Sequence, residues 1–134
     1  MNTPREDGHV HLADYLPPAW RIPRAELAFD LDAEATTVEA VLSLEPDPFR
    51  EPMPIELDGE ELALLAIELD GRALAADEYT YDGRVLRIPG VIGPCRLRTV
   101  VRIHPAANTR LEGLYRSGKL LLTQCEAQGF RRIT

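Results

Sequence analysis

Two stretches in the first third of the chain alternate apolar and polar residues with a period of two. The first covers residues 25–31 and the second residues 37–44, and in both most apolar side chains are followed by a charged or hydroxyl side chain. This period is typical of β-strands that have one face in the core and one face in water. Because a polar turn over residues 32–36 joins the two stretches, we expect an antiparallel hairpin.

The middle of the chain contains three Asp-Gly pairs at a constant spacing of twelve residues. They are Asp58-Gly59, Asp70-Gly71 and Asp82-Gly83. Asp-Gly favours a two-residue hairpin turn, because both central residues of that turn have positive φ. Regular turns of this kind are typical of a β-sandwich or barrel. Segment 60–69 contains many helix formers, but the flanking turns and its short length favour a strand over a short helix.

Prolines mark the segments that should lie at the margins of the sheet. Segment 15–23 contains three prolines and should run extended, with Tyr15 and Trp20 available to attach it to the body. Segment 45–54 contains four prolines, which indicates a connector or a sheet edge.

The last third of the chain predicts two more strands around a polar segment. Residues 95–104 alternate, with Leu97 and Val101 on one side and arginines on the other, and predict a long strand. Residues 108–118 are polar and contain glycine, so we expect an irregular loop or a wide hairpin. Residues 120–123 predict a short apolar strand. The whole pattern therefore predicts an all-β fold class.

Composition and charge narrow the class of protein. The chain has 134 residues, 45% hydrophobic and 28% charged, as expected for one globular domain. Its net charge of −7 would repel phosphate backbones, which argues against a nucleic-acid partner. No apolar run approaches the roughly 20 residues that cross a bilayer, so we expect no membrane partner. The only two cysteines, Cys95 and Cys125, predict reduced thiols and a cytoplasmic location.

The domain organisation that we expect is simple. Residues 1–14 are mostly polar and predict a flexible N-terminal arm, whereas residues 15–134 predict a single β domain. The chain stops at Thr134 without a charged tail or a capping turn, which suggests truncation.

Segment 108–134 contains two blocks of residues that are specific when taken together. They are Asn-Thr-Arg-Leu-Glu-Gly-Leu-Tyr and, further on, Thr-Gln-Cys-Glu-Ala-Gln-Gly-Phe-Arg. With these blocks the chain closely resembles the proteobacterial cytosolic aminopeptidase N family. Segments 14–18, 29–32, 57–60 and 69–72 are similar to the family as well, so the resemblance covers nearly the whole chain after the first dozen residues.

The resemblance implies a zinc exopeptidase that removes N-terminal amino acids from peptides. Its first domain would be a saddle-shaped antiparallel β-sandwich, and a downstream catalytic domain would hold zinc through His-Glu-x-x-His and a distant Glu. This chain lacks that signature, because its three histidines, His9, His11 and His104, do not have the required spacing. We therefore expect no metal ligand, no catalytic residue and no activity in this chain alone, with zinc bound only elsewhere in the parent enzyme.

Gln124 and Glu126 are the candidate substrate-binding residues. In the family, the Gln-x-Glu motif reaches into the active-site cleft, where the carboxylate meets the free α-ammonium of the peptide and the glutamine lines the first specificity pocket. A carboxylate makes a charge-assisted hydrogen bond to an ammonium group, and this contact fixes the distance to the scissile carbonyl. Because residues two apart on a strand share a face, we expect both side chains on one face. The alternative is a pair of solvated polar residues at a strand end.

Five further residues could have a chemical role, but each has a simpler structural interpretation. Cys125 has no adjacent histidine and is expected to be a small buried residue rather than a nucleophile. His9 and His11 could chelate a metal weakly, but two incidental histidines on a mobile arm are the simpler interpretation. Arg131 and Arg132 are expected to be solvated, although pairs with acidic groups or with the downstream domain are alternatives.

Three functional interpretations stay open on the sequence alone. The chain is the non-catalytic N-terminal domain of a zinc aminopeptidase, a stand-alone β-sandwich binding or interaction module, or a zinc-less scaffold relative. In the family the first domain extends beyond position 134, so we expect an incomplete sheet at the C-terminus. An unpaired sheet edge recruits another chain, which predicts a homo-oligomer, domain swapping or a disordered C-terminal segment.

Overall fold

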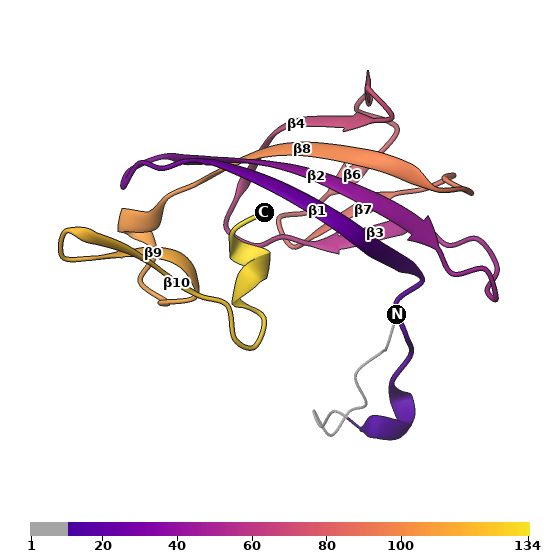
Figure 1. The fold of residues 1–134 in the computed structure, drawn as a ribbon, viewed down its shortest axis with the longest axis horizontal. Helices are drawn as coiled ribbons and strands as arrows, with labels where there is room; N and C mark the ends of the chain where they lie inside the picture. The colour runs from indigo at the N-terminus through magenta and orange to yellow at the C-terminus, as the bar shows by residue number, and fades with distance from the viewer. Residues whose placement is uncertain (1–10) are drawn as a thin grey trace.

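The computed structural model describes residues 11–134 as a β structure with short connections (Figure 1). In chain order the strands and the short 3-10 helices (η) are η1 (Leu12–Asp14), β1 (Trp20–Asp30), β2 (Thr36–Pro46), β3 (Ile55–Asp58), β4 (Ala63–Leu69), β5 (Arg72–Ala73), β6 (Thr80–Tyr81), β7 (Val85–Ile88), β8 (Cys95–Ile103), η2 (Pro105–Ala107), β9 (Gly113–Ser117), β10 (Leu120–Gln124) and η3 (Gly129–Arg132). The all-β fold class is confirmed. Most of the predicted arm lies outside the described residues. Within residues 11–134, no helix is long and apolar enough to span a membrane.

The largest sheet contains five antiparallel strands in the order β1-β2-β8-β4-β5. The predicted hairpin is confirmed, because β1 pairs with β2, with Leu27 opposite Ala40 and Phe29 opposite Val38. The predicted strand 95–104 is β8, which lies between β2 and β4 at the centre of the sheet. In Figure 1 these long strands form one curved layer.

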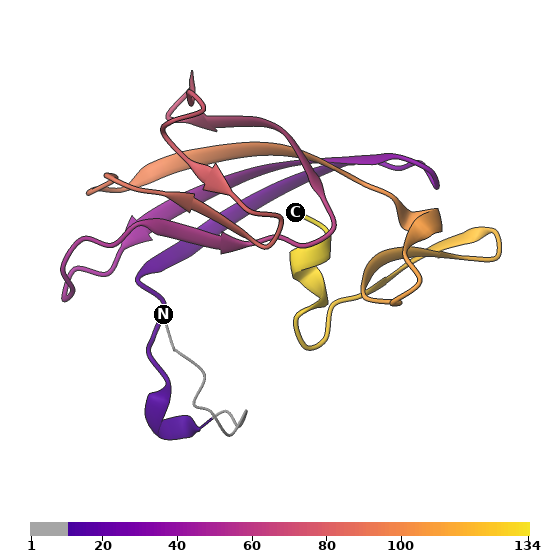
Figure 2. The same cartoon turned by 180° about the vertical axis from the view of Figure 1, so that it is seen from behind.

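A smaller sheet in the order β3-β7-β6 packs against this layer (Figure 2). Buried side chains from both sheets form the core between them: Trp20, Leu44, Ile55, Ile67, Leu86, Ile88 and Leu97. The alternation in the sequence explains this packing, because every second side chain of β8 is buried and the arginines between them face outward. Two antiparallel sheets around one core are the predicted β-sandwich.

Segment 60–69 contains strand β4 and not a helix. Its ladder with β8 satisfies the backbone of residues that favour a helix in isolation. On the outer face, Arg98 of β8 forms ion pairs with Glu68 at 3.1 Å and with Glu39 at 2.8 Å, one on each neighbouring strand. Tertiary pairing therefore overrides the local propensity, in the direction that the flanking turns predicted.

Only one of the Asp-Gly pairs 58–59, 70–71 and 82–83 makes the predicted two-residue hairpin turn. Asp70 and Gly71 have φ of 49° and 81° and join β4 to β5. In the pair 58–59, Asp58 is instead the last residue of β3 and Gly59 begins the connection to β4, which leads from the smaller sheet to the larger one. The pair 82–83 begins a wider loop, in which the Asp82 carboxylate accepts hydrogen bonds from two backbone N–H groups at 2.8 Å each.

Strand β1 is an edge of the larger sheet and is mostly exposed. The indole of Trp20 donates a hydrogen bond to the Met53 carbonyl at 2.9 Å and is buried, which attaches the start of the strand to the body. Tyr15 is exposed, so Trp20 alone of the two predicted anchors is buried. Pro23 lies at an irregularity in the pairing with β2, as expected for proline on an edge strand.

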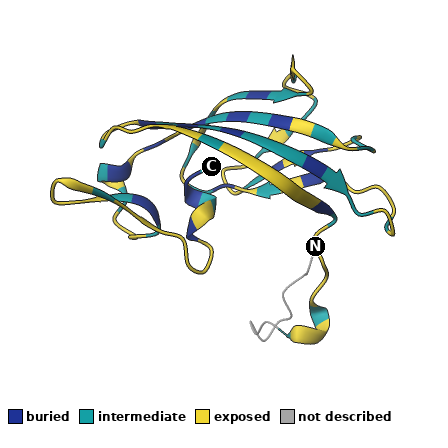
Figure 3. Ribbon diagram, in the orientation of Figure 1, coloured by how far each residue is buried: buried dark blue, intermediate teal, exposed yellow. Residues whose placement is uncertain are grey.

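The β9–β10 hairpin and η3 are attached to one end of the sandwich. A second apolar cluster joins them to β2 and β8: Val38, Val101, Ile103, Leu114 and Ile133. Figure 3 shows buried positions on β9 and η3, while the hairpin tip is exposed. The predicted strand 120–123 is β10. Of segment 108–118, which we expected to be an irregular loop or a wide hairpin, only residues 108–112 are irregular, because residues 113–117 form β9 and pair with β10 through a tight two-residue turn.

Candidate functional site

Strand β10 ends at Gln124, and the chain then enters a turn that contains Glu126. The prediction that these two side chains share one face of a regular strand is therefore wrong. Both side chains are exposed, and the peptide bond between Glu126 and Ala127 is cis.

The turn folds back onto the strand that it leaves. The Gly129 N–H donates a hydrogen bond to the Cys125 carbonyl at 3.1 Å. A Cβ atom at Gly129 would lie 2.2 Å from the carbonyl oxygen of Gln124, a distance that no side chain tolerates. Glycine at this position lets the two ends of the segment, which we name the 124–129 loop, touch each other. The loop therefore turns back on β10 directly after Gln124, where the strand ends.

Strand β9 supports the loop from the opposite side. Gly113 is the partner of Gln124 in the β9–β10 ladder, and it has a φ of +74°. A Cβ atom at Gly113 would lie 2.8 Å from the Cβ of Arg132, so β9 and η3 approach each other closely. The Asn108 side chain donates hydrogen bonds to two carbonyls at the start of β9, at 2.6 and 3.0 Å. Strand, loop and η3 therefore pack backbone against backbone.

Arg132 is buried, which contradicts the expectation of a solvated charge. Its side chain is 2% exposed. The guanidinium donates a hydrogen bond to Glu61 and lies 3.2 Å from Glu112 and 3.9 Å from Glu60. A buried charge needs partners of opposite sign, and these glutamates supply them. Arg131 is partly exposed and lies 3.4 Å from Glu60.

The charges of this Arg132 cluster (Arg132 with Glu60, Glu61 and Glu112) influence one another. The hydrogen bond from Arg132 lowers the pKa of Glu61 below its ordinary value, and the same bond raises the pKa of Arg132. The sequence analysis missed this cluster. Its only local signals are two consecutive acids after Asp58-Gly59 and two consecutive arginines near the end, and 71 positions separate Glu61 from Arg132. No short-range pattern connects residues so far apart.

The two cysteines differ in their surroundings. Cys125 is exposed, so the prediction of a small buried residue is wrong. The reason is that the strand has already ended, and Cys125 faces no second layer. Cys95 at the start of β8 is partly buried, and this burial raises the pKa of its thiol. Both thiols are free.

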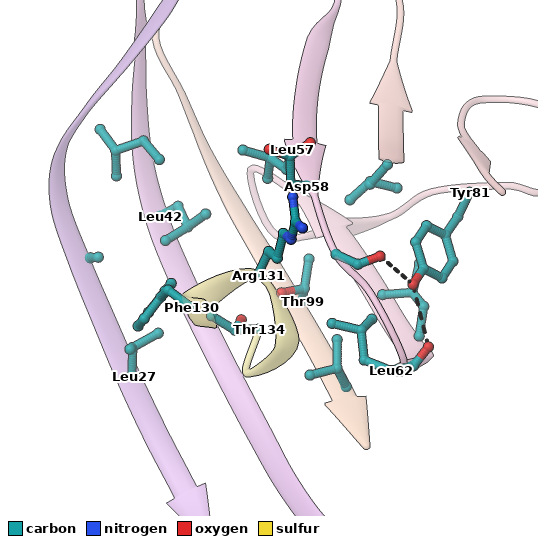
Figure 4. A pocket seen from close by; sticks show the side chains of 16 residues that line it. Leu27, Leu42, Leu57, Asp58, Leu62, Tyr81, Thr99, Phe130, Arg131 and Thr134 are labelled. Atoms are coloured by element: carbon teal, nitrogen blue, oxygen red, sulfur yellow. Dashed lines mark hydrogen bonds between the residues drawn. The ribbon is translucent and has the colours of Figure 1, made fainter. Parts of the chain in front are cut away.

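An apolar cavity of about 280 Å³ lies between the two sheets (Figure 4). Leucines of both sheets line it, and Phe130, Arg131 and Thr134 reach it from the end of the chain. Gln124 and Glu126 do not line this cavity. The cavity is therefore separate from the candidate substrate-binding residues.

The described part of the chain does not fit a zinc centre. Within residues 11–134, no three His, Cys, Asp or Glu side chains are grouped so that they could hold a metal ion. His104 Nδ1 lies 2.6 Å from the carbonyl oxygen of Glu34, which gives this ring a backbone partner. His11 lies just before η1, and its suggested partner His9 falls outside the described residues.

The chain is similar in sequence to bacterial proteins named aminopeptidase N. It is 40% identical to the one from Escherichia coli (strain K12) over 121 residues, which are 90% of this chain. It is 45% identical to the one from Caulobacter vibrioides over 125 residues, or 93% of this chain. The chain spans 14% of the length of each of these relatives. No family model matches it.

Solved structures share the fold. Legionella pneumophila aminopeptidase A matches 90% of this chain with a TM-score of 0.82 and 25% identity, over 14% of its own length. An M1 zinc metallopeptidase from Deinococcus radiodurans matches 87% of this chain with a TM-score of 0.65, over 29% of its own length, and its 16% identity makes this a likeness of fold alone. By sequence and by fold, the chain matches one β domain of bacterial aminopeptidases and spans 14% of their length.

Proposed function

We propose that this chain is the non-catalytic, substrate-anchoring domain of a zinc aminopeptidase, an enzyme that removes N-terminal amino acids from peptides. One observation carries the proposal. The 124–129 loop presents Gln124 and Glu126 to solvent, at the far end of β10, in a chain 40–45% identical to proteins named aminopeptidase N.

Glu126 would bind the free α-ammonium of the peptide, and Gln124 would contact the first side chain. A peptide has only one α-ammonium, so a carboxylate that pairs with it selects the chain end. In open water an ion pair of this kind contributes at most about 1 kcal/mol. In a cleft that excludes water it becomes a strong charge-assisted hydrogen bond. The loop therefore needs an opposing wall, which we assign to the downstream catalytic domain of the same enzyme.

Zinc and the catalytic groups belong, in this proposal, to the rest of the enzyme. The chain spans 14% of its curated relatives, which leaves most of their length for a metal site. The described residues supply no cluster that fits zinc. We also place the enzyme in the cytoplasm, since the unpaired Cys95 and Cys125 are consistent with a reducing compartment.

The test is the substitution Glu126→Gln in the full-length enzyme, assayed with an aminoacyl chromogenic substrate. Loss of a charge-assisted hydrogen bond of about 1.5–3 kcal/mol should raise KM about 10- to 100-fold with little change in kcat. The matched control is Glu51→Gln, which removes the same charge from an exposed position on the β2–β3 connection. An unchanged KM in Glu126→Gln would contradict the proposal.

The isolated chain provides a second test. Without the catalytic domain it should not cleave the same substrate, with or without added zinc. Zinc-dependent cleavage by the isolated chain would show that its assignment as non-catalytic is wrong.

A further inference from the structure

We propose that Arg132 is a positioning residue, which sets the place of Glu126 relative to the sandwich. The proposal rests on the proposed function, because it assumes that Glu126 contacts the substrate. Arg132 itself is buried and does not reach solvent, so it acts through the loop that precedes it.

The Arg132 side chain is held from two directions. Its guanidinium contacts carboxylates from two separate connections. Glu61, its hydrogen-bond partner, lies between β3 and β4, and Glu112, at 3.2 Å, lies just before β9. Contacts from two directions fix a planar guanidinium more strictly than one ion pair does. The end of η3 is therefore held against both the sandwich and the hairpin.

Arg132 is connected to the loop by the short helix η3. Helix η3 begins at Gly129 and ends at Arg132. The backbone of Gly129 packs directly against the Gln124 carbonyl, so the two ends of the loop cannot move independently of each other. One backbone bond adds to this attachment, since the Glu60 N–H donates to the Arg131 carbonyl at 2.8 Å. A shift of the Arg132 end of η3 must therefore move the loop that carries Glu126.

Fold stability alone does not require a charged side chain at position 132. Buried ion pairs are weak contributors to stability, and an apolar side chain of similar size often replaces them at no loss. The Nε and Nη2 atoms of Arg132 make no hydrogen bond within residues 11–134, although carboxylates lie near them. The guanidinium makes a directional hydrogen bond to Glu61, which an apolar side chain cannot make.

The experiment compares Arg132→Met, Glu126→Ala and the double variant in the full-length enzyme, with KM and kcat as readouts. Arg132→Met should raise KM about tenfold, because a loop displaced by less than 1 Å misplaces the carboxylate, and it should change kcat less than about twofold. When Glu126 is already replaced by alanine, Arg132→Met should not raise KM further, because Arg132 acts on the substrate only through the Glu126 carboxylate. The control Arg116→Met removes a half-exposed arginine of β9 and should leave KM unchanged.

Each outcome decides between the two proposals. If Glu126→Ala leaves KM unchanged, the proposed function fails. If Glu126→Ala raises KM and Arg132→Met does not, the positioning role of Arg132 is overturned while the proposed function stands. The positioning role is also overturned if Arg132→Met raises KM equally in the wild-type enzyme and in Glu126→Ala, because the effect would then not depend on Glu126. Should Arg132→Met not fold, Glu61→Gln replaces it in the same cycle, and an unchanged KM in that variant overturns the role.

Discussion

Acidic side chains in this chain are stabilised in two ways that differ in range. Asp82 has a lowered pKa because it accepts hydrogen bonds from the N–H groups of Val85 and Arg84, within its own turn. Glu61 has a lowered pKa because of Arg132, 71 positions away, although its side chain is 57% exposed. The first arrangement follows from local turn chemistry, and the second depends on the fold.

The Glu61–Arg132 hydrogen bond predicts a dependence of stability on pH. The folded-state pKa of Glu61 lies below its ordinary value of 4.5, so its contribution is fully present above pH 4.5 and is lost as the pH falls through the lower folded-state value. Thermal unfolding of the chain and of Glu61→Gln should show a gap in Tm at pH 7 that narrows below pH 4.5. A difference in Tm that stays constant down to pH 2 would contradict a stabilising role of the Glu61–Arg132 hydrogen bond. The control is Glu51→Gln, which removes one surface charge elsewhere.

At the scale of elements, glycines decide how closely the β9–β10 hairpin and η3 approach each other. Gly129 meets a carbonyl of β10, and Gly113 of β9 meets the Cβ of Arg132. Both contacts leave no room for a methyl group. Leu114 and Ile133 join these elements to β2 and β8 through the second apolar cluster, while Leu120 and Leu122 of β10 are exposed. The close backbone contacts add to this apolar packing and set the spacing between the hairpin and η3.

The substitution Gly129→Ala should destabilise the chain. The added Cβ would lie 2.2 Å from the Gln124 carbonyl oxygen, and backbone must move to accept it. We expect a loss of about 1–3 kcal/mol in the free energy of unfolding, measured by denaturant titration. Gly93→Ala is the matched control, since no atom lies within 4 Å of its added Cβ, and it should change the free energy by less than about 0.5 kcal/mol. Equal effects of the two substitutions would show that the contact at Gly129 is relaxed in solution.

At the scale of the whole molecule, the sandwich has an apolar surface on one edge. Within residues 11–134 no strand pairs with the outer side of β1, and Ile22 and Phe29 are 45% and 42% exposed. Charged residues such as Arg24 and Glu26 lie on the same strand and oppose edge-to-edge pairing. The balance between these features decides whether the isolated chain stays monomeric.

We expect the isolated chain to self-associate through β1. Sedimentation velocity over a range of concentrations should show a dimer that grows with concentration, because an open edge and exposed apolar side chains favour pairing. Phe29→Lys should weaken the dimer. Phe49→Lys, at a 95% exposed position on the β2–β3 connection, should leave it unchanged. A strict monomer at every concentration would contradict the expectation.

The sequence predicted the parts of this protein that depend on neighbouring residues. The alternation of apolar and polar positions predicted β1, β2 and β8 with the correct faces of β2 and β8, since a side-chain period of two is a local property of a strand. The turn at Asp70-Gly71 followed from its residue types, because they tolerate positive φ. The blocks in segment 108–134 indicated the family, which the similarity to proteins named aminopeptidase N bears out.

The tertiary structure decided what depends on residues far apart in the chain. Burial of Arg132 required Glu61, which local patterns cannot bring to it. Strand β10 ends at Gln124, so Gln124 and Glu126 do not share a strand face and Cys125 is exposed, and the loop that follows folds back until Gly129 packs against the Gln124 carbonyl. Long-range contacts choose among local conformations of similar free energy. For that reason the residue pattern predicted β1, β2, β8 and β10 and indicated the family, while strand β9 and the shape and support of the loop that carries Glu126 depend on the folded chain.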